Sequence, residues 1–557
     1  MVESQRNIRI QFLLLIVLWF LCTLPGLVGR DPWKSDESYS FGLVFEMLKT
    51  GDWVVPTLAG EPFMEKPPIM YIMSAITART LSPLLPLHDA ARGTVFFFAA
   101  LTFLSLGAAA RELGQPEKWW IAPALLLGSV GLVHNQHMMI TDVALLAGFA
   151  LAHAGFAFSS RRPMFGGLVL GTGIGIAFLA KGLLGPGLLG LTAIALPVLF
   201  KTWRTDKYLK TLLITALSAL PWLVIWPLLL YSRSPVLFFE WFWTNNFGRF
   251  LGENNLGPKR ETFLYATTLL TLGFPVFPLS VWSWWKERKM VGQSALLQIT
   301  LVSFMTGMVV LNISSEGRSL YAQPVFISLC LASLPAATEL GGKQSRIASA
   351  LFVIVFVLFL AGGWSLWTMM MVGWPAAART LVLQKVPDYL PTFQPWAFAG
   401  GVAVTSAAIF CWCLADRMGE ALIIKWCTVV GLCYGLVMTL FLPIINSNMS
   451  YKTIMTSLGC NLPSRYLCVA SVGLGEPQRA MIHYYANLRT LRTEVEPGAL
   501  DICDVMLIQS NYNDNIHNRL PARDSWKLVW EGRHGSRELF RLYFRLPSEN
   551  IERKVLK

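Results

Sequence analysis

The sequence has little charge for its length. Asp, Glu, Lys and Arg make up only 14% of its 557 residues, whereas 54% are hydrophobic and the mean hydropathy is +0.50. A soluble domain usually carries about 25% charged residues. Here the charges are confined to short stretches between apolar runs of about 20 residues, the length that crosses a bilayer. This pattern excludes an ordinary soluble protein and predicts a polytopic α-helical membrane protein.

Several other features are missing. The nine cysteines form no disulfide framework, since most lie inside apolar runs and only Cys460, Cys468 and Cys503 lie in the polar C-terminal stretch, where one disulfide fits an oxidising compartment. The sequence shows no glycine-rich nucleotide fingerprint and no internal repeat. Basic loops beside the membrane account for much of the net charge of +13, so we expect no nucleic-acid partner.

The lengths of the apolar runs predict about thirteen transmembrane helices, the first of them a retained span rather than a cleaved signal peptide. Their cores are 10–28, 90–110, 119–134, 142–159, 165–180, 184–200, 211–231, 263–284, 294–312, 319–336, 347–371, 396–414 and 426–445. Alternate connections are short and basic, which predicts that they are cytoplasmic. The outer connections are then 29–89, 135–141, a turn near Lys181, 232–262, 313–318, 372–395 and the tail from residue 446.

These boundaries predict two domains. Residues 1–445 form a transmembrane catalytic domain, whose long first outer loop, 29–89, contains amphipathic helices suited to the membrane interface. Residues 446–557 form a small soluble α/β domain on the outer side, since about 110 residues suffice for such a core. Long outer loops beside minimal inner ones indicate that the protein works on its outer face.

Carboxylates in the outer connections are the first candidates for chemistry. Asp36 and Glu37 follow the first span, where paired carboxylates orient or deprotonate an acceptor or hold a metal ion. Solvated loop charges are the alternative. Asp142 opens the fourth span, and helix capping is its alternative role. His134 and His137 lie beside the same connection, but two ligands are too few for a metal site.

Cations in four outer connections are the second set. Lys66 follows Glu65 and precedes two prolines that restrict the backbone, so it is presented in a defined direction and suits a lipid phosphate. Lys181 lies between two apolar spans, where an ionisable group is costly and marks a functional site. Arg249 and Arg318 also lie on the outer side. Snorkelling lysines and solvated loop arginines are the alternatives.

Together these groups suit one task. A cluster of cations with a few carboxylates binds one or two phosphates and positions a nucleophile. The hypothesis requires that residues from separate connections converge in one pocket.

At these residues the chain resembles the bacterial aminoarabinose transferase family, within the GT-C class that includes protein O-mannosyltransferases. The matching motifs are Asp36-Glu37, Gly51-Asp52-Trp53, Glu65-Lys66-Pro67, Asp142, Phe178-Leu179-Ala180-Lys181-Gly182 and Arg249-Phe250. The resemblance implies a thirteen-span GT-C domain with a periplasmic C-terminal domain, in the bacterial inner membrane with the active site facing the periplasm.

The resemblance also implies an activity. The family transfers 4-amino-4-deoxy-L-arabinose from undecaprenyl phosphate to a lipid A phosphate, with inversion expected for a direct attack. Asp36 and Asp142 are then the catalytic candidates. The substrate- and phosphate-binding candidates are Glu37, Lys66, Lys181, Arg249 and Arg318. Glu65 matches a position that can bind a divalent metal ion, the one cofactor considered.

Two positions depart from the family, and two rival functions remain. Asn245 and Asn246 replace a typical Glu-His, which weakens the metal assignment, and Glu316-Gly317-Arg318 replaces a Lys-Gly-Lys-like segment. One rival is a GT-C transferase that modifies a protein or another cell-surface glycan. The other is a membrane transporter or flippase, against which the sequence offers no paired broken helices in two related halves.

Overall fold

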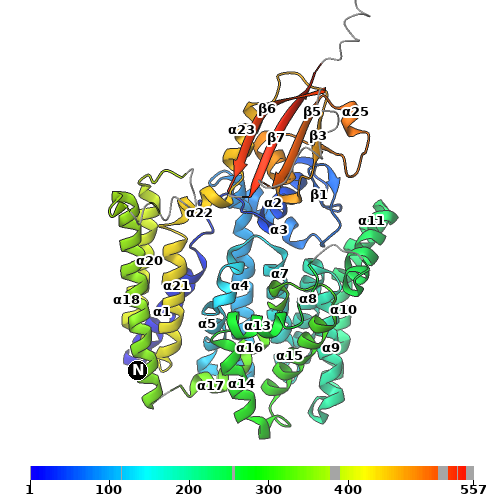
Figure 1. Ribbon diagram of the computed structural model, residues 1–557. Coiled ribbons are helices and arrows are strands. Elements are labelled where there is room, and N and C mark those ends of the chain that lie inside the picture. The colour runs from blue at the N-terminus through cyan, green and yellow to red at the C-terminus, as the bar shows by residue number, and fades with distance from the viewer. Residues whose placement is uncertain are drawn as a thin grey trace, which may run out of the picture.

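The computed structural model describes residues 2–114, 116–253, 258–340, 342–376, 380, 389–511, 525–535 and 537–546. It is a helical bundle with a small sheet stacked on one end, which we call the sheet end (Figure 1). The unbroken long helices are α1 (Val2–Thr23), α4 (Leu87–Leu113), α7 (Thr141–Phe158), α8 (Pro163–Lys181), α9 (Leu184–Leu199), α10 (Asp206–Arg233), α15 (Ala295–Ile313), α18 (Gly342–Val372) and α20 (Pro395–Ala415).

Other predicted spans are interrupted. These are α5 (Ile121–Leu127) with α6 (Val130–Val133), α13 (Leu264–Leu272) with α14 (Val276–Lys286), α16 (Val325–Ala332) with α17 (Leu334–Thr338), and α21 (Ala421–Val437) with α22 (Leu442–Met449). The second pair bends by 99° at a break that contains Gly273 and Pro275, and the last pair bends by 64°. Proline lacks the amide proton that a helix needs, so a break at this point is expected.

Every predicted apolar run coincides with a helix or an interrupted pair, and the protein is a multi-pass membrane protein. Within the described ranges, seven helices are long and apolar enough to cross a bilayer, or nine if each bent pair counts as one span. The first span ends at Thr23 rather than at residue 28, because Pro25 and the left-handed Gly26 (φ 81°) follow.

The first loop, residues 24–86, folds onto the sheet end. It contains α2 (Asp36–Thr50), a short antiparallel hairpin of β1 (Thr57–Leu58) and β2 (Glu61–Pro62), and α3 (Ile69–Leu81). Helix α2 is buried along most of its length and packs against α3 and against α24 (Glu476–Ala486). The loop is therefore part of the packed core and not a flexible connection.

The C-terminal segment, residues 450–546 where described, forms the sheet. Its strands are β3 (Val469–Val472), β4 (Leu491–Arg492), β5 (Val505–Asn511), β6 (Trp526–His534) and β7 (Glu538–Arg545). Their order is β4-β3-β5-β7-β6, with β3 parallel to β4 and β5, and with β7 antiparallel to its neighbours. Helices α23 (Lys452–Cys460), α24 and α25 (Ala499–Ile502) complete it. Cys468 and Cys503 form the one disulfide that the sequence allowed.

Glu538 joins this segment to the first loop. Its carboxylate accepts hydrogen bonds from Lys34 at 3.1 Å and from Tyr451 at 2.8 Å. It also pairs with His534 at 2.8 Å. Burial alone would raise the pKa of Glu538, but these partners outweigh burial and hold its pKa at about 2. The two parts of the chain are thus fastened by charge as well as by apolar packing.

Candidate functional site

Most of the predicted residues meet at the sheet end of the bundle. Asp36 opens α2, Glu65 and Lys66 precede α3, Asp142 lies in the first turn of α7, and Lys181 ends α8. Arg249 opens α12 (Arg249–Leu251), which follows the π-helical stretch η4 (Glu240–Gly248), and Arg318 precedes η6 (Ser319–Ala322). The contacts described below join these separate connections.

Glu65 and Arg249 form the centre of the cluster. The Arg249 Nη1 lies 2.7 Å from the Glu65 carboxylate, and its Nε lies 2.5 Å from Glu316. Burial alone would raise the pKa of Glu65, but Lys66 and Arg249 outweigh it and hold its pKa at about 2. The same carboxylates raise the pKa of Arg249 against the opposing effect of burial. Both groups therefore stay charged at any physiological pH.

Lys66 points into the protein. Its Nζ donates a hydrogen bond to the Tyr39 hydroxyl at 2.5 Å and lies 3.8 Å from the Glu65 carboxylate. Burial alone would lower the pKa of Lys66, but Glu65 and the Tyr39 and Tyr71 hydroxyls outweigh it and raise its pKa well above the ordinary value. The side chain is 12% exposed, so the alternative of a lysine that snorkels to the surface is wrong.

Asp142 and Lys181 form an ion pair. The Asp142 side chain is only 2% exposed, and the Lys181 Nζ also lies 4.4 Å from the centre of the Tyr321 ring. Asp142 makes no capping hydrogen bond at the start of α7, so the capping alternative is not supported. The Asp142 carboxylate instead neutralises the Lys181 cation, whose charge would be energetically costly beside the bilayer without a partner.

Asp36 and Arg318 lie at the more open edge of the cluster. The Arg318 Nη1 donates to the Asp36 carboxylate at 3.2 Å, and their side chains are 41% and 20% exposed. The Asp36 carboxylate is also close enough to influence the ionisation of Tyr39 beside Lys66. Asp36 and Glu65, with side chains 20% and 22% exposed, are therefore the partly accessible carboxylates among the predicted site residues, whereas Asp142 and Glu37 are buried.

A cavity of about 280 Å³ opens beside these residues. Its polar and charged lining includes Glu65, Lys66, Lys181, Arg249, Glu316 and Tyr321. Its apolar lining includes Leu183, Leu184, Leu188, Leu191, Phe247, Phe250, Val310 and Leu311. A cavity lined by both cations and aliphatic and aromatic side chains suits an amphiphile with an anionic head group.

Charges in this cluster balance. Lys66, Lys181, Arg249 and Arg318 face the carboxylates of Asp36, Glu65, Asp142 and Glu316. The cluster is thus neutral without a ligand, and a phosphate that enters competes with carboxylates for the same cations.

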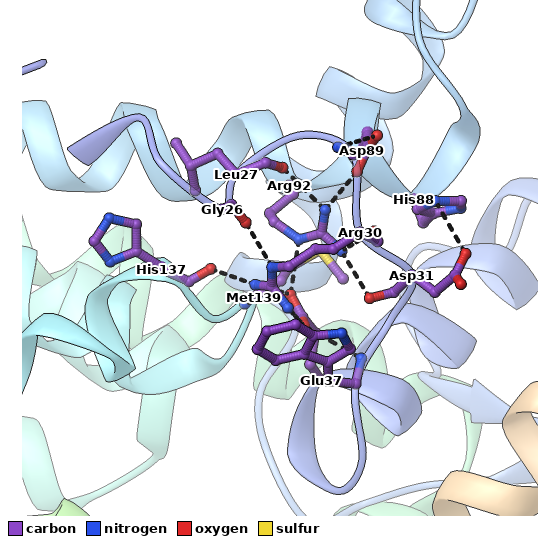
Figure 2. Close-up of polar contacts among 12 residues, drawn as sticks. Gly26, Leu27, Arg30, Asp31, Glu37, His88, Asp89, Arg92, His137 and Met139 are labelled. Carbon is purple, nitrogen blue, oxygen red and sulfur yellow. Dashed lines mark hydrogen bonds and ion pairs between the residues drawn. The ribbon is translucent and has the colours of Figure 1, made fainter. Parts of the chain in front are cut away.

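Glu37 is not part of this cluster. Figure 2 shows Arg30 and Arg92 converging on its carboxylate, and the Arg92 Nε lies 2.9 Å from it. Asp89 pairs with Arg92, and the Glu37 side chain is 0% exposed. Arg30 and Arg92 outweigh the effect of burial and hold the pKa of Glu37 at about 2. Glu37 therefore fastens α2 to α4 and has no free oxygen for a substrate, so the substrate-binding prediction for it is not supported.

The residues present do not fit a metal ion. Glu65 is engaged by Arg249 and Lys66, two cations that repel a metal ion. Asn246 accepts from the Leu183 amide at 3.0 Å and donates to the Trp241 carbonyl at 2.7 Å, so it fixes the turn after Lys181. Within the part of the chain that the structure describes, no group of three or more His, Cys, Asp or Glu residues could hold a metal ion.

Three polar contacts of the site were not predicted. Tyr39, Tyr321 and Glu316 touch Lys66, Lys181 and Arg249, respectively. Each lies within three residues of a predicted site residue in the sequence. Their proximity along the chain was the available signal, but nothing in the sequence says which neighbours face inward.

Comparison with solved structures defines the fold. The crystal structure of ArnT from Cupriavidus metallidurans, bound to undecaprenyl phosphate, matches this structure with a TM-score of 0.70. The match covers 97% of this chain and 98% of that chain at 16% sequence identity. The protein therefore has the membrane-protein fold of ArnT.

Comparison with curated proteins points to the same family, although no family model matches the chain. The chain is 29% identical over 297 residues to an undecaprenyl phosphate-α-4-amino-4-deoxy-L-arabinose arabinosyl transferase of Sodalis glossinidius and spans about half of its length, 51%. A second such transferase of that bacterium is 24% identical over 535 residues, which cover 91% of this chain and 90% of that relative. The resemblance to the aminoarabinose transferase family is confirmed.

Proposed function

We propose that the protein is an inverting glycosyltransferase that moves 4-amino-4-deoxy-L-arabinose from undecaprenyl phosphate to a phosphate of lipid A. The observation that carries the proposal is the cavity lined by both cations and apolar side chains. That combination suits the phosphate and the isoprenoid chain of a lipid carrier. The names of the related transferases supply the sugar and the carrier.

In this reaction the acceptor oxygen attacks the anomeric carbon of the sugar, and the bond to the carrier phosphate breaks. The leaving group is undecaprenyl phosphate, which departs with the bonding electrons and gains negative charge. Lys66, Lys181 and Arg249 stabilise that charge in a site shielded from water. No nucleotide is needed, because the carrier phosphate is already a good leaving group.

Asp36 and Asp142 take different parts in this scheme. Asp36 is partly exposed and pairs with Arg318, so in this scheme it orients an anionic phosphate acceptor through Arg318 or removes the proton of a hydroxyl acceptor. Asp142 is buried and holds the Lys181 amine toward the cavity. Asp142 is then a positioning residue for the leaving-group phosphate.

We further propose the topology that this chemistry requires. The chain has thirteen spans of the GT-C type in the bacterial inner membrane, and the sheet end faces the periplasm. Residues 1–445 are the catalytic membrane domain, in which the loop 29–89 contributes interfacial helices, and residues 446–557 are a soluble periplasmic domain. The basic connections at the opposite end support this orientation.

Two rivals make different predictions. A GT-C transferase with a protein or glycan acceptor would use the same carrier site with another acceptor. A transporter or flippase is the rival of another class. The described part of the structure contains two bent helix pairs, whereas the feature expected of a transporter is a set of broken helices paired in two related halves. The cavity lies at one end of the bundle beside a charge-balanced cluster, which favours an enzyme.

The test uses the purified full chain in detergent with undecaprenyl-phosphate-linked aminoarabinose and lipid A. We expect lipid A to gain the mass of one aminopentose. Transfer without a sealed membrane excludes a transporter as the source of the activity. Lipid A that stays unmodified while a protein or glycan acceptor gains the sugar would replace the lipid A proposal with the first rival.

A further inference from the structure

The hairpin that precedes Lys66 is fixed from outside the membrane bundle. It turns at Ala59 and Gly60, both with positive φ (50° and 93°), and the Phe63 amide donates to the Pro56 carbonyl at 2.8 Å. Glu61 therefore lies at the end of a tight turn, four residues before Glu65. A contact that fixes Glu61 therefore also restrains Glu65, because the segment between them is short and hydrogen-bonded.

Two arginines of the C-terminal segment supply that constraint. The Nη1 atoms of Arg479, on α24, and Arg492, on β4, lie 2.8 Å and 3.0 Å from the same Glu61 carboxylate oxygen. The Arg479 side chain is 6% exposed, whereas the Glu61 carboxylate is 33% exposed, so the ion pair is buried on its arginine side only. A third arginine, Arg489, packs close to Gly60, since a Cβ atom at Gly60 would lie 3.4 Å from the Arg489 Cδ.

The same segment also fastens α2. Arg489 and His483 both pair with Glu46, which is buried in the last half of that helix. A Cβ atom at Gly42 would lie 2.5 Å from the Ala480 Cβ, so α2 and α24 pack in direct contact. Helix α2 carries Tyr39, the hydrogen-bond partner of Lys66. Both neighbours of Lys66, its own loop and Tyr39, are therefore held by the C-terminal segment.

We propose that Glu61, Arg479 and Arg492 are positioning residues, through which the C-terminal segment holds Lys66 in the orientation that binds the carrier phosphate. The inference rests on the proposed function for the identity of the ligand. It assigns the C-terminal segment a role in substrate binding although none of its described residues lines the cavity. An ordered loop binds more tightly than a mobile one, because less conformational entropy is lost on binding.

The first test measures the loop without a ligand. Hydrogen exchange of peptides that cover residues 57–68 should be faster in Glu61→Gln and in Arg479→Gln than in the wild-type chain. The matched control is Glu531→Gln, which removes a cross-strand ion pair to Arg541 (2.7 Å) within the same sheet and away from the first loop. It should leave this exchange unchanged. Equal exchange in Glu61→Gln and the wild-type chain would overturn the inference.

The second test measures affinity for undecaprenyl phosphate in detergent. We expect Glu61→Gln to weaken binding about five- to tenfold, as for an interaction of about 1 kcal/mol, with the thermal midpoint of the bundle unchanged. The double variant Glu61→Gln, Arg479→Gln should bind no more weakly than Glu61→Gln alone, because Glu61→Gln already removes the carboxylate with which Arg479 pairs. Glu61→Asp should recover part of the affinity. A looser loop with unchanged affinity, or additive losses in the double variant, would overturn the inference. A wild-type chain that binds no undecaprenyl phosphate would refute the proposed function instead, and the exchange test would still decide the state of the loop.

Discussion

The Asp142–Lys181 ion pair separates stability from function in one set of variants. Breaking a buried pair by removing one partner costs about 3–5 kcal/mol, because the other charge stays buried without compensation. The side chains here are 2% and 12% exposed, so we expect a loss near the lower end, about 3 kcal/mol. Asp142→Asn and Lys181→Met should each lower the thermal midpoint in detergent by a similar amount.

The double variant carries the decisive information. With both charges removed, no buried charge remains unpaired, so Asp142→Asn combined with Lys181→Met should cost only about 1 kcal/mol. Its sugar transfer should stay as low as that of Lys181→Met, because the cation for the leaving phosphate is absent. Thermal unfolding and a transfer assay on the same preparations measure both effects. The reasoning would be refuted if the stability losses of the two single variants added up in the double variant, or if sugar transfer recovered in the double variant together with stability.

Three further predictions concern the C-terminal segment. Glu538, with its pKa held at about 2, contributes stability that is fully present above about pH 4.5 and is lost as the pH falls toward 2. Glu538→Gln should remove about 3 kcal/mol of stability at neutral pH and flatten this acid dependence in thermal unfolding. An unchanged pH profile of stability in the variant would contradict the role assigned to Glu538. Replacing Cys468 and Cys503 by serine removes a disulfide with a sequence separation of 35 and should lower the stability of the C-terminal segment by about 3–4 kcal/mol. The loss is measured as faster proteolysis, and equal proteolysis rates in the variant and the wild-type chain would contradict the prediction. Gly42→Ala should loosen the packing of α2 against α24, because no room exists for the new Cβ atom. Hydrogen exchange should then be faster in both helices, and unchanged exchange would show that the contact is not tight.

Much of the bundle was predictable because apolar length is a local property. The positions of the long helices, of α24 and of four strands in the C-terminal segment follow from runs that the sequence displays openly. The bends were not predicted, because the hydropathy of the sequence does not change at a break such as that near Pro275, where the helix changes direction within an apolar run. The two-residue strand β4 is too short to leave a pattern.

The site was predictable residue by residue but not as an arrangement. Lys66 and Lys181 are conspicuous because charge is rare beside apolar spans. Asp36 and Glu37 could not be separated, because adjacent residues differ only by their direction around the helix, about 100°. Asp36 faces Arg318 at the more open edge of the cluster, and Glu37 faces Arg30 and Arg92. The pairing of Glu65 with Arg249, 184 residues away, depends on tertiary packing that no local pattern records.

The central claim is that the cations that line the cavity hold the phosphate of the lipid carrier. The most direct measurement is the affinity of the purified chain for undecaprenyl phosphate, compared between the wild-type chain and Lys66→Ala. The account predicts measurable binding that falls at least tenfold in the variant, as for the loss of about 1.4 kcal/mol or more, while the thermal midpoint stays within a few degrees. Equal affinity in the two proteins would contradict the account.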